Sequence, residues 1–235
     1  MSRRCYSKFH TFICKLVSGT QPKANITAEA KDILNSLIYD LCDRYAQHAA
    51  RLCKHGGKIT LDSNAIETLT KIWLGEDSEP LLESAHTAWE NYSQCERKGV
   101  TKYVKAGLQL PPTRIKNIIG EQLLKGQKIG ETCYIFLTAI IEYVIKSLVV
   151  CAIDLGAEES KVTVNGRLLY NAINSSEMRL WRPLFPNTFI AGFGVVGDQM
   201  LMDTQFGLLS VYDSDTDTET SSDNDSESVT NSRSI

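Results

Sequence analysis

Two groups of residues have types and spacings that could do chemistry. The first is Gly192 to Gly197, which spells Gly-x-Gly-x-x-Gly, a pattern that can place backbone N–H groups around a dinucleotide pyrophosphate. Such a site needs a strand before the motif and a helix after it, within a β-α-β unit. Only 38 residues follow Gly197, and the last 23 of them are low in complexity. We therefore expect no cofactor.

The second group is a set of potential metal ligands that are close in the sequence: Cys42, His48, Cys53 and His55. On a helix, Cys42, His48 and Cys53 do not share one face well, and the chain has no Cys-x-x-Cys pair. The four histidines also lack the motif context of a Ser/His/Asp or Cys/His catalytic arrangement. We predict no metal site and no catalytic residues, and we classify the protein as a non-enzyme.

Charge is distributed unevenly along the chain. Of the 28 acids and 25 bases, seven acids and one base lie from Asp213 onward, so residues 1–212 carry a net charge of +3 and the remainder −6. This asymmetry favours a nucleic-acid-binding body with an acidic tail. The end of the chain is rich in Ser, Asp and Thr and poor in apolar residues, which predicts a disordered tail.

Neither a secretory signal nor a membrane span is expected. Arg3 and Arg4 lie near the start of the chain, but no apolar run follows them. The most apolar stretch, Tyr134 to Leu155, is interrupted by three charged residues, which indicates a buried helix. The seven scattered cysteines are typical of free thiols in a reducing, intracellular compartment.

The elements that position these residues repeat one pattern twice: short helix, loop, long helix, loop, short helix. The first half is expected to have helices at 6–17, 27–54 and 60 or 62–74, followed by one that starts at Ser78-Glu79-Pro80. The second half is expected to have helices at 111–124, 132–155 and 165–173, with Gly156 ending the long one. Each long helix carries an apolar stripe that its short neighbours cannot cover, so we predict that the halves pack into one core.

Both halves show a family resemblance. The first half resembles histone 2B at Tyr6-Ser7, Ile26, Asn35-Ser36, Asp40, Arg44, Arg51-Leu52 and Ile59-Thr60. The second half resembles histone 2A at Ala106 to Pro111, Arg114, Glu142-Tyr143, Arg167-Leu168, Ala172-Ile173 and Ile190 to Val195. The fused order is similar to the histone doublets of large DNA viruses of the Marseillevirus type, and the departures described below suggest a variant form.

The resemblance implies an all-α fold of two tandem histone folds packed as an intramolecular handshake dimer, with an extended C-terminal docking segment and a disordered acidic tail. The implied boundaries are a histone 2B-like fold with its C-terminal helix at 1–94, a linker at 95–106, a histone 2A-like fold at 107–181, the docking segment at 182–200 and the tail at 201–235.

The resemblance also implies a DNA-binding surface made by loops and helix N-termini. It places the first loop of each fold beside the second loop of the other, which groups Lys23 and Asn25 with Lys161 and Thr163. The same rule groups Lys58 and Thr60 with Lys128. Lys128 stands where the family has arginine, and a lysine lacks the planar fork of that side chain. The implied DNA-binding residues are Arg3, Arg4, Lys8, Lys23, Asn25, Lys58, Thr60, Arg114, Lys116, Lys128, Lys161, Thr163 and Arg167.

The outer face of the 2A family carries a cluster of acids to which partners bind. The residual acidic patch in this chain consists of Asp77, Glu142 and Glu177. Other positions of the cluster are occupied by Ser147, Val150, Ser176 and Met178. Ordinary acidic-patch binding is therefore not expected.

The implied function is packaging of double-stranded DNA. Two copies of the chain would join a tetramer of histone-three-like and histone-four-like folds. No membrane partner is expected. The protein would be found in the virion and in the viral factory or nucleus of an infected cell. Two alternatives stay open: a histone-fold transcription-regulatory module, and an acidic histone chaperone suggested by the tail. The docking segment argues against the first, and the net basic body argues against the second.

Overall fold

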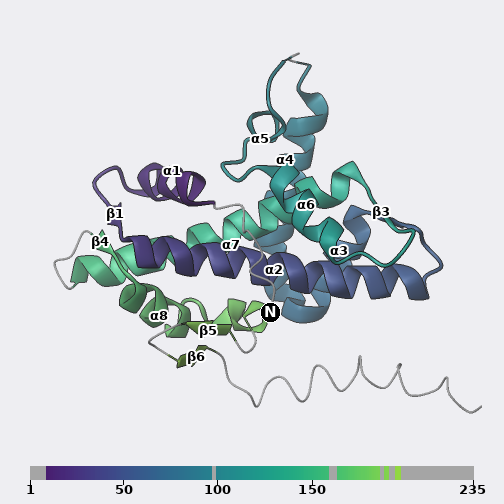
Figure 1. Ribbon diagram of the computed structural model, residues 1–235. Coiled ribbons are helices and arrows are strands. Elements are labelled where there is room, and N and C mark those ends of the chain that lie inside the picture. The colour runs from purple at the N-terminus through teal and green to yellow at the C-terminus, as the bar shows by residue number, and fades with distance from the viewer. Residues whose placement is uncertain (1–8, 97–98, 159–162, 186–187, 191–193, 197–235) are drawn as a thin grey trace, which may run out of the picture. The chain divides into compact units, whose positions relative to one another are not determined.

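The computed structural model describes residues 9–96, 99–158, 163–185, 188–190 and 194–196 (Figure 1). The chain divides into two units, Met1–Gln199 and Met200–Ile235. The second unit, which contains the predicted tail, lies outside the described residues. The described part is all-α apart from strands of two or three residues, as predicted.

One order of elements occurs twice: helix, short strand, long helix, short strand, helix. The first repeat consists of α1 (His10–Thr20), β1 (Asn25–Ile26), α2 (Ala28–His55), β2 (Thr60–Leu61) and α3 (Ser63–Leu74). It is followed by η1 (Gly75–Ser78), α4 (Glu79–Gln94) and α5 (Lys102–Lys105). The second repeat consists of α6 (Pro112–Glu121), β3 (Lys128–Ile129), α7 (Glu131–Glu158), β4 (Thr163–Val164) and α8 (Gly166–Asn174). After it come η2 (Arg179–Leu184), β5 (Thr188–Ile190) and β6 (Gly194–Val196).

Local capping explains where three of the helices begin. The side chains of Thr27, Asp62 and Asn165 each accept a hydrogen bond from the backbone N–H three residues further on, at the starts of α2, α3 and α8. A side-chain oxygen at this position satisfies one of the N–H groups that have no partner within the helix. The predicted starts of these helices are confirmed.

The strand pairs fix how the two long helices lie. β1 pairs with β4 and β2 pairs with β3, both in parallel. β1 directly precedes α2 while β4 follows α7, and β2 follows α2 while β3 directly precedes α7. The two long helices must therefore run in opposite directions, and Figure 1 shows α2 and α7 passing each other with β1 and β4 at one end and β3 at the other.

A single apolar core joins the two repeats. Leu41 and Tyr45 of α2 and Leu137 and Ile141 of α7 are all buried in it. α7 packs against helices of both repeats, chiefly α4, α8 and α3. It is long and apolar enough to cross a membrane by composition alone, with a mean hydropathy of 2.0, but 72% of its apolar window is buried inside the protein. α7 is therefore a core helix, as predicted, and the two repeats share one core.

Four predicted helix boundaries are wrong: the start and the end of α1, the end of α7 and the end of α6. α1 has Phe9 as its N-cap residue and continues past Ser18 to Thr20. In this last turn the Ser18 and Thr20 hydroxyls donate to carbonyls one turn back, at 2.9 and 3.0 Å. α7 continues through Gly156 to Glu158. A glycine within a helix costs about 1 kcal/mol relative to alanine, which the packing of this buried helix outweighs.

The fourth is the end of α6, which stops at Glu121 and not at Leu124. The side-chain oxygen of Gln127 accepts a hydrogen bond from the N–H of Leu124 at 3.1 Å, and its amide donates to the carbonyl of Ala50 at 2.9 Å. This contact with α2 replaces the last helical turn.

The predicted docking segment is more structured than an extended chain. Arg182–Leu184 belong to the 3-10 helix η2, and the Arg44 guanidinium donates to the carbonyl of Pro183 at 2.5 Å. Further on, β5 and β6 pair as an antiparallel hairpin. The described part of the Gly-x-Gly-x-x-Gly motif, Gly194–Val196, is one strand of this hairpin, which differs from the β-α-β setting that a dinucleotide site requires.

Candidate nucleic-acid interface

At one end of the core, the loop before α2 lies beside the loop after α7. Asn25 is aligned with Thr163 and Ile26 with Val164, and the N–H of Thr27 donates to the carbonyl of Val164 at 3.0 Å. Val164 is buried and Ile26 half-buried, whereas Asn25 and Thr163 are exposed. The apolar residues thus anchor the pair and the polar ones face solvent.

Two predicted cations belong to this end and a third does not lie within the described residues. Lys23 is exposed just before β1, and Arg167 is exposed in the first turn of α8, which follows β4. Lys161 lies outside the described residues, as do Arg3, Arg4 and Lys8. The grouping of Asn25 with Thr163 is therefore present in the structure, while that of Lys23 with Lys161 stays a prediction.

At the opposite end, the loop after α2 lies beside the loop before α7. Thr60 is aligned with Lys128, and both side chains are exposed. The N–H of Lys128 donates to the carbonyl of Ile59 at 2.9 Å, and that of Gly130 donates to the carbonyl of Leu61 at 2.8 Å. A Cβ atom at Gly130 would lie 2.9 Å from the carbonyl oxygen of Leu61, so this close approach requires glycine.

Lys58 completes this second end with a reduced effective charge. Its ammonium lies 3.2 Å from the carboxylate of Asp62, the residue that caps α3. In the described part of the chain Lys128 takes part in no ion pair. Of the two predicted cations at this end, it is therefore the one whose charge is not offset. Exposed Lys128 beside exposed Thr60 offers one charge and one hydroxyl donor to a phosphate.

Arg114 and Lys116 at the start of α6 lie apart from both loop pairs in the sequence and are positioned by aromatic rings. The Arg114 guanidinium lies 5.1 Å from the ring centre of Phe12 and 5.9 Å from that of Phe9, both from the first repeat. The Lys116 ammonium lies 5.6 Å from the ring centre of Tyr134. These contacts fix where the two charges lie.

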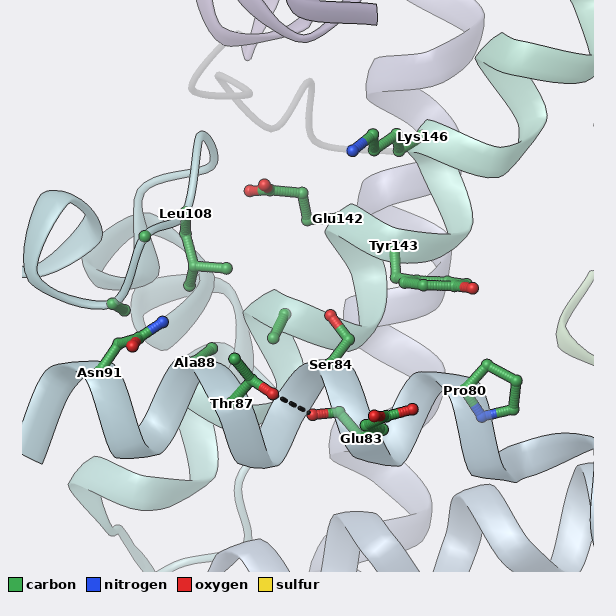
Figure 2. A pocket seen from close by; sticks show the side chains of 13 residues that line it. Pro80, Glu83, Ser84, Thr87, Ala88, Asn91, Leu108, Glu142, Tyr143 and Lys146 are labelled. Carbon is green, nitrogen blue, oxygen red and sulfur yellow. Dashed lines mark hydrogen bonds between the residues drawn. The ribbon is translucent and has the colours of Figure 1, made fainter.

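The three predicted acidic-patch residues occupy different surroundings. Glu142 lines a groove of about 410 Å³ between α4 and α7, together with Glu83 and Lys146 (Figure 2). Its carboxylate accepts hydrogen bonds from the backbone N–H groups of Gln109 and Leu110, both at 2.7 Å. Burial raises the pKa of Glu142, although these two bonds act in the opposite direction. Glu142 therefore holds the chain that leads into α6.

Glu177 and Asp77 are exposed at other places. Glu177 lines a second groove, of about 400 Å³, which shares Tyr143 and Lys146 with the first one and is otherwise lined largely by apolar side chains. Asp77 lies in η1. Lys146 lines both grooves, so a cation lies beside Glu142 as well as beside Glu177.

Three of the four residues considered above as metal ligands are packed in the core or against an aromatic ring. Cys42 and Cys53 are buried in the core, and the His48 ring meets the Trp73 ring edge-on at 5.5 Å. Within the residues that the structure describes, no three His, Cys, Asp or Glu side chains form a group that could hold a metal ion.

The structure also shows basic residues that the sequence analysis did not single out. Lys15 of α1 lies 5.9 Å from the ring centre of Phe12, and Lys102 of α5 lies 5.2 Å from that of Tyr134. Lys102 and Lys105 lie in a stretch of 12 residues predicted to be a linker. The basic composition of that stretch was the available signal.

Comparisons with known proteins identify the family. No family model matches the chain. The chain is 30% identical to histone H2B.v3 of Dictyostelium discoideum over 106 residues, which cover 40% of this chain and 69% of that protein. The chain therefore belongs to the histone family. Among solved structures it is similar to the crystal structure of the histone from Methanopyrus kandleri, with a TM-score of 0.49 and 14% identity over 70% of this chain and 91% of that one.

Proposed function

We propose that this histone is a structural, non-catalytic DNA-packaging protein of the doublet type, with a 2B-like fold followed by a 2A-like fold. The observation that carries the proposal is the pairing of loops at both ends of the core, β1 with β4 and β2 with β3. Through these pairs the two repeats of one chain form a surface that would otherwise require two separate histone chains.

The chemistry of the paired loops suits a phosphate backbone. Both ends expose short polar side chains together with cations, as in Asn25 with Lys23 and Thr60 with Lys128. Contacts of this kind position a protein on DNA without reading its sequence. The proposed partner is therefore double-stranded DNA of any sequence.

The assembly that we propose has two copies of the chain joined to a tetramer of histone-three-like and histone-four-like folds. The segment from η2 to β6 would make the contact with that tetramer. A viral origin, with the protein in the virion and in the viral factory or nucleus of the infected cell, is part of the same proposal and rests on the resemblance to viral doublets.

The proposal is tested by reconstituting the full chain with histone-three-like and histone-four-like partners on DNA, followed by nuclease digestion. A discrete protected fragment is expected. DNA binding without a protected fragment would favour a transcription-regulatory module, and binding of free histones without DNA would favour a chaperone. Either result would overturn the packaging function.

A matched pair of variants connects this test to the loops. Lys128→Gln removes a cation from the β2–β3 end, whereas Lys146→Gln removes a cation, also exposed, from the groove side of α7. Lys128→Gln should weaken DNA binding to the same degree for all sequences and reduce the salt dependence, and Lys146→Gln should change neither. Equal effects of the two variants would contradict the assignment of the loops.

A further inference from the structure

We propose that the linker between the two repeats is itself a DNA-contacting element. It adds a basic surface where α1, α5 and α6 meet, here called the seam patch and made by Lys15, Lys102, Lys105, Arg114 and Lys116. The inference rests on the proposed DNA-binding function and adds a third contact surface to the two loop pairs.

The charge of the linker motivates the inference. Residues 95–106 contain four bases and one acid, a net charge of +3. Residues 1–212 as a whole also carry +3, so the remainder of that region, with 20 bases and 20 acids, is neutral. The net positive charge of the body therefore equals that of a stretch of 12 residues. Two of the four linker bases, Arg97 and Lys98, lie outside the described residues.

Aromatic contacts place the linker against both repeats. The Tyr103 ring of α5 meets the Phe12 ring of α1 edge-on, with 6.3 Å between ring centres. On the same Phe12 ring, Arg114 of α6 lies at 5.1 Å and Lys15 of α1 at 5.9 Å. Phe12 is thus the point at which the first repeat, the linker and the second repeat meet.

A second aromatic ring gathers the other lysines. The ammonium groups of Lys102 and Lys116 lie 5.2 and 5.6 Å from the ring centre of Tyr134. Lys102 donates hydrogen bonds to the carboxylate of Glu131 and, at 2.6 Å, to the hydroxyl of Tyr134. Lys105 follows three residues after Lys102, a spacing that places both on the same face of α5.

The resulting surface suits a polyanion. Basic side chains from three elements lie against aromatic rings that hold them in place, and Glu131 offsets the charge of Lys102. Clustered lysines and arginines that face one strand of phosphates release condensed counterions on binding, which gives affinity without sequence preference. Because α1 and α6 belong to different repeats, the linker connects bases of both repeats, through Tyr103 at the Phe12 ring and Lys102 at the Tyr134 ring.

The test uses the full chain and duplex DNA, with affinity measured by fluorescence anisotropy between about 50 and 200 mM salt. The seam variant is Lys15→Gln with Lys105→Gln, which leaves the hydrogen bonds of Lys102 intact. The control is Lys71→Gln with Lys146→Gln, which removes the same charge from α3 and α7. Circular dichroism and thermal unfolding verify that both variants keep the fold.

Each phosphate contact contributes about 0.9 to the slope of log affinity against log salt. The seam variant should lower that slope by about 1.8 relative to the control, and Lys105→Gln alone by about half as much. A seam variant that matches the control, while the wild type binds DNA, would overturn the seam patch and leave the proposed function standing. If Lys15→Gln lowered the slope and Lys105→Gln did not, the linker would not be part of the DNA-contacting surface. A wild-type chain without salt-dependent DNA binding would overturn the proposed function as well.

Discussion

Glu142 holds a turn of the chain through two backbone groups. Its carboxylate accepts the N–H groups of Gln109 and Leu110, directly before the prolines that open α6. From the sequence this residue was expected to belong to a residual acidic patch. The structure shows it half-buried beside the linker.

Replacing Glu142 with alanine should lower the free energy of unfolding. A hydrogen bond to a charged group contributes about 1.5 to 3 kcal/mol when buried, and the partial exposure of this site reduces the expected total to about 2 kcal/mol. Chemical denaturation measures the change. Lys146→Ala, one turn away and exposed, should cost less than about 0.5 kcal/mol. Equal losses for the two variants would show that Glu142 does not hold the turn.

Glu131 gives a prediction that depends on pH. The donors Lys102, Tyr92 and Tyr134 lower its pKa from the ordinary 4.5 to about 2. Because the pKa is depressed in the folded state, the stabilisation by the ionised carboxylate is complete above about pH 4.5 and is lost as pH falls toward 2. Denaturation of the wild type and Glu131→Gln at pH 6 and pH 3 should show a smaller difference at pH 3. A constant difference would contradict this account.

At the scale of elements, helix starts depend on residues within one turn, and this explains why the sequence predicted them. Thr27 and Asn165 accept hydrogen bonds from the N–H groups of Ala30 and Leu168, at 3.2 and 2.9 Å. Both caps lie next to the β1–β4 pair, so they also fix the loops on which Asn25 and Thr163 are exposed.

Removing either cap should lower stability by about 1 kcal/mol. The variants are Thr27→Ala and Asn165→Ala, with Thr27→Ser as the matched control because serine retains the hydroxyl. Urea denaturation should place Thr27→Ser close to the wild type. If serine were as destabilising as alanine, the contribution of Thr27 would come from its methyl group and not from capping.

Other elements depend on contacts that are distant in the sequence, and these the sequence did not predict. Gln127 ends α6 by bonding to Ala50, 77 positions away, and Arg44 contacts Pro183, 139 positions away. The loop pairs were expected only because the family resemblance implied them. α5 is four residues long, too short for a periodic pattern, so its two lysines, Lys102 and Lys105, were missed.

Arg44 allows the position of η2 to be tested. Its guanidinium lies 4.4 Å from the ring centre of Trp73 and donates to the carbonyl of Pro183. Lysine lacks the planar group that makes both contacts, so Arg44→Lys should loosen η2 by about 1 kcal/mol, a change of about fivefold in its opening equilibrium. Tryptic cleavage after Arg179 should accelerate accordingly. Arg51→Lys, exposed two turns further along α2, should leave the rate unchanged, and equal rates for both variants would contradict the role of Arg44.

At the scale of the whole molecule, the two repeats depend on each other for a core. α4 follows the first repeat in the chain, yet it packs mainly against α7 of the second. α7 is buried on most of its surface by helices from both repeats, and the loop pairs exist only across the repeats. Because one chain carries both repeats, the two halves of this shared core cannot separate on dilution.

The most direct test of this account expresses residues 1–94 and 107–200 separately and follows helicity and thermal unfolding by circular dichroism. Each half alone should lack a cooperative transition, because its long helix would expose its apolar stripe to water. An equimolar mixture should recover the helicity of the full chain and its salt-dependent DNA binding. A separate cooperative transition in each isolated half would contradict the claim that the two repeats form one core.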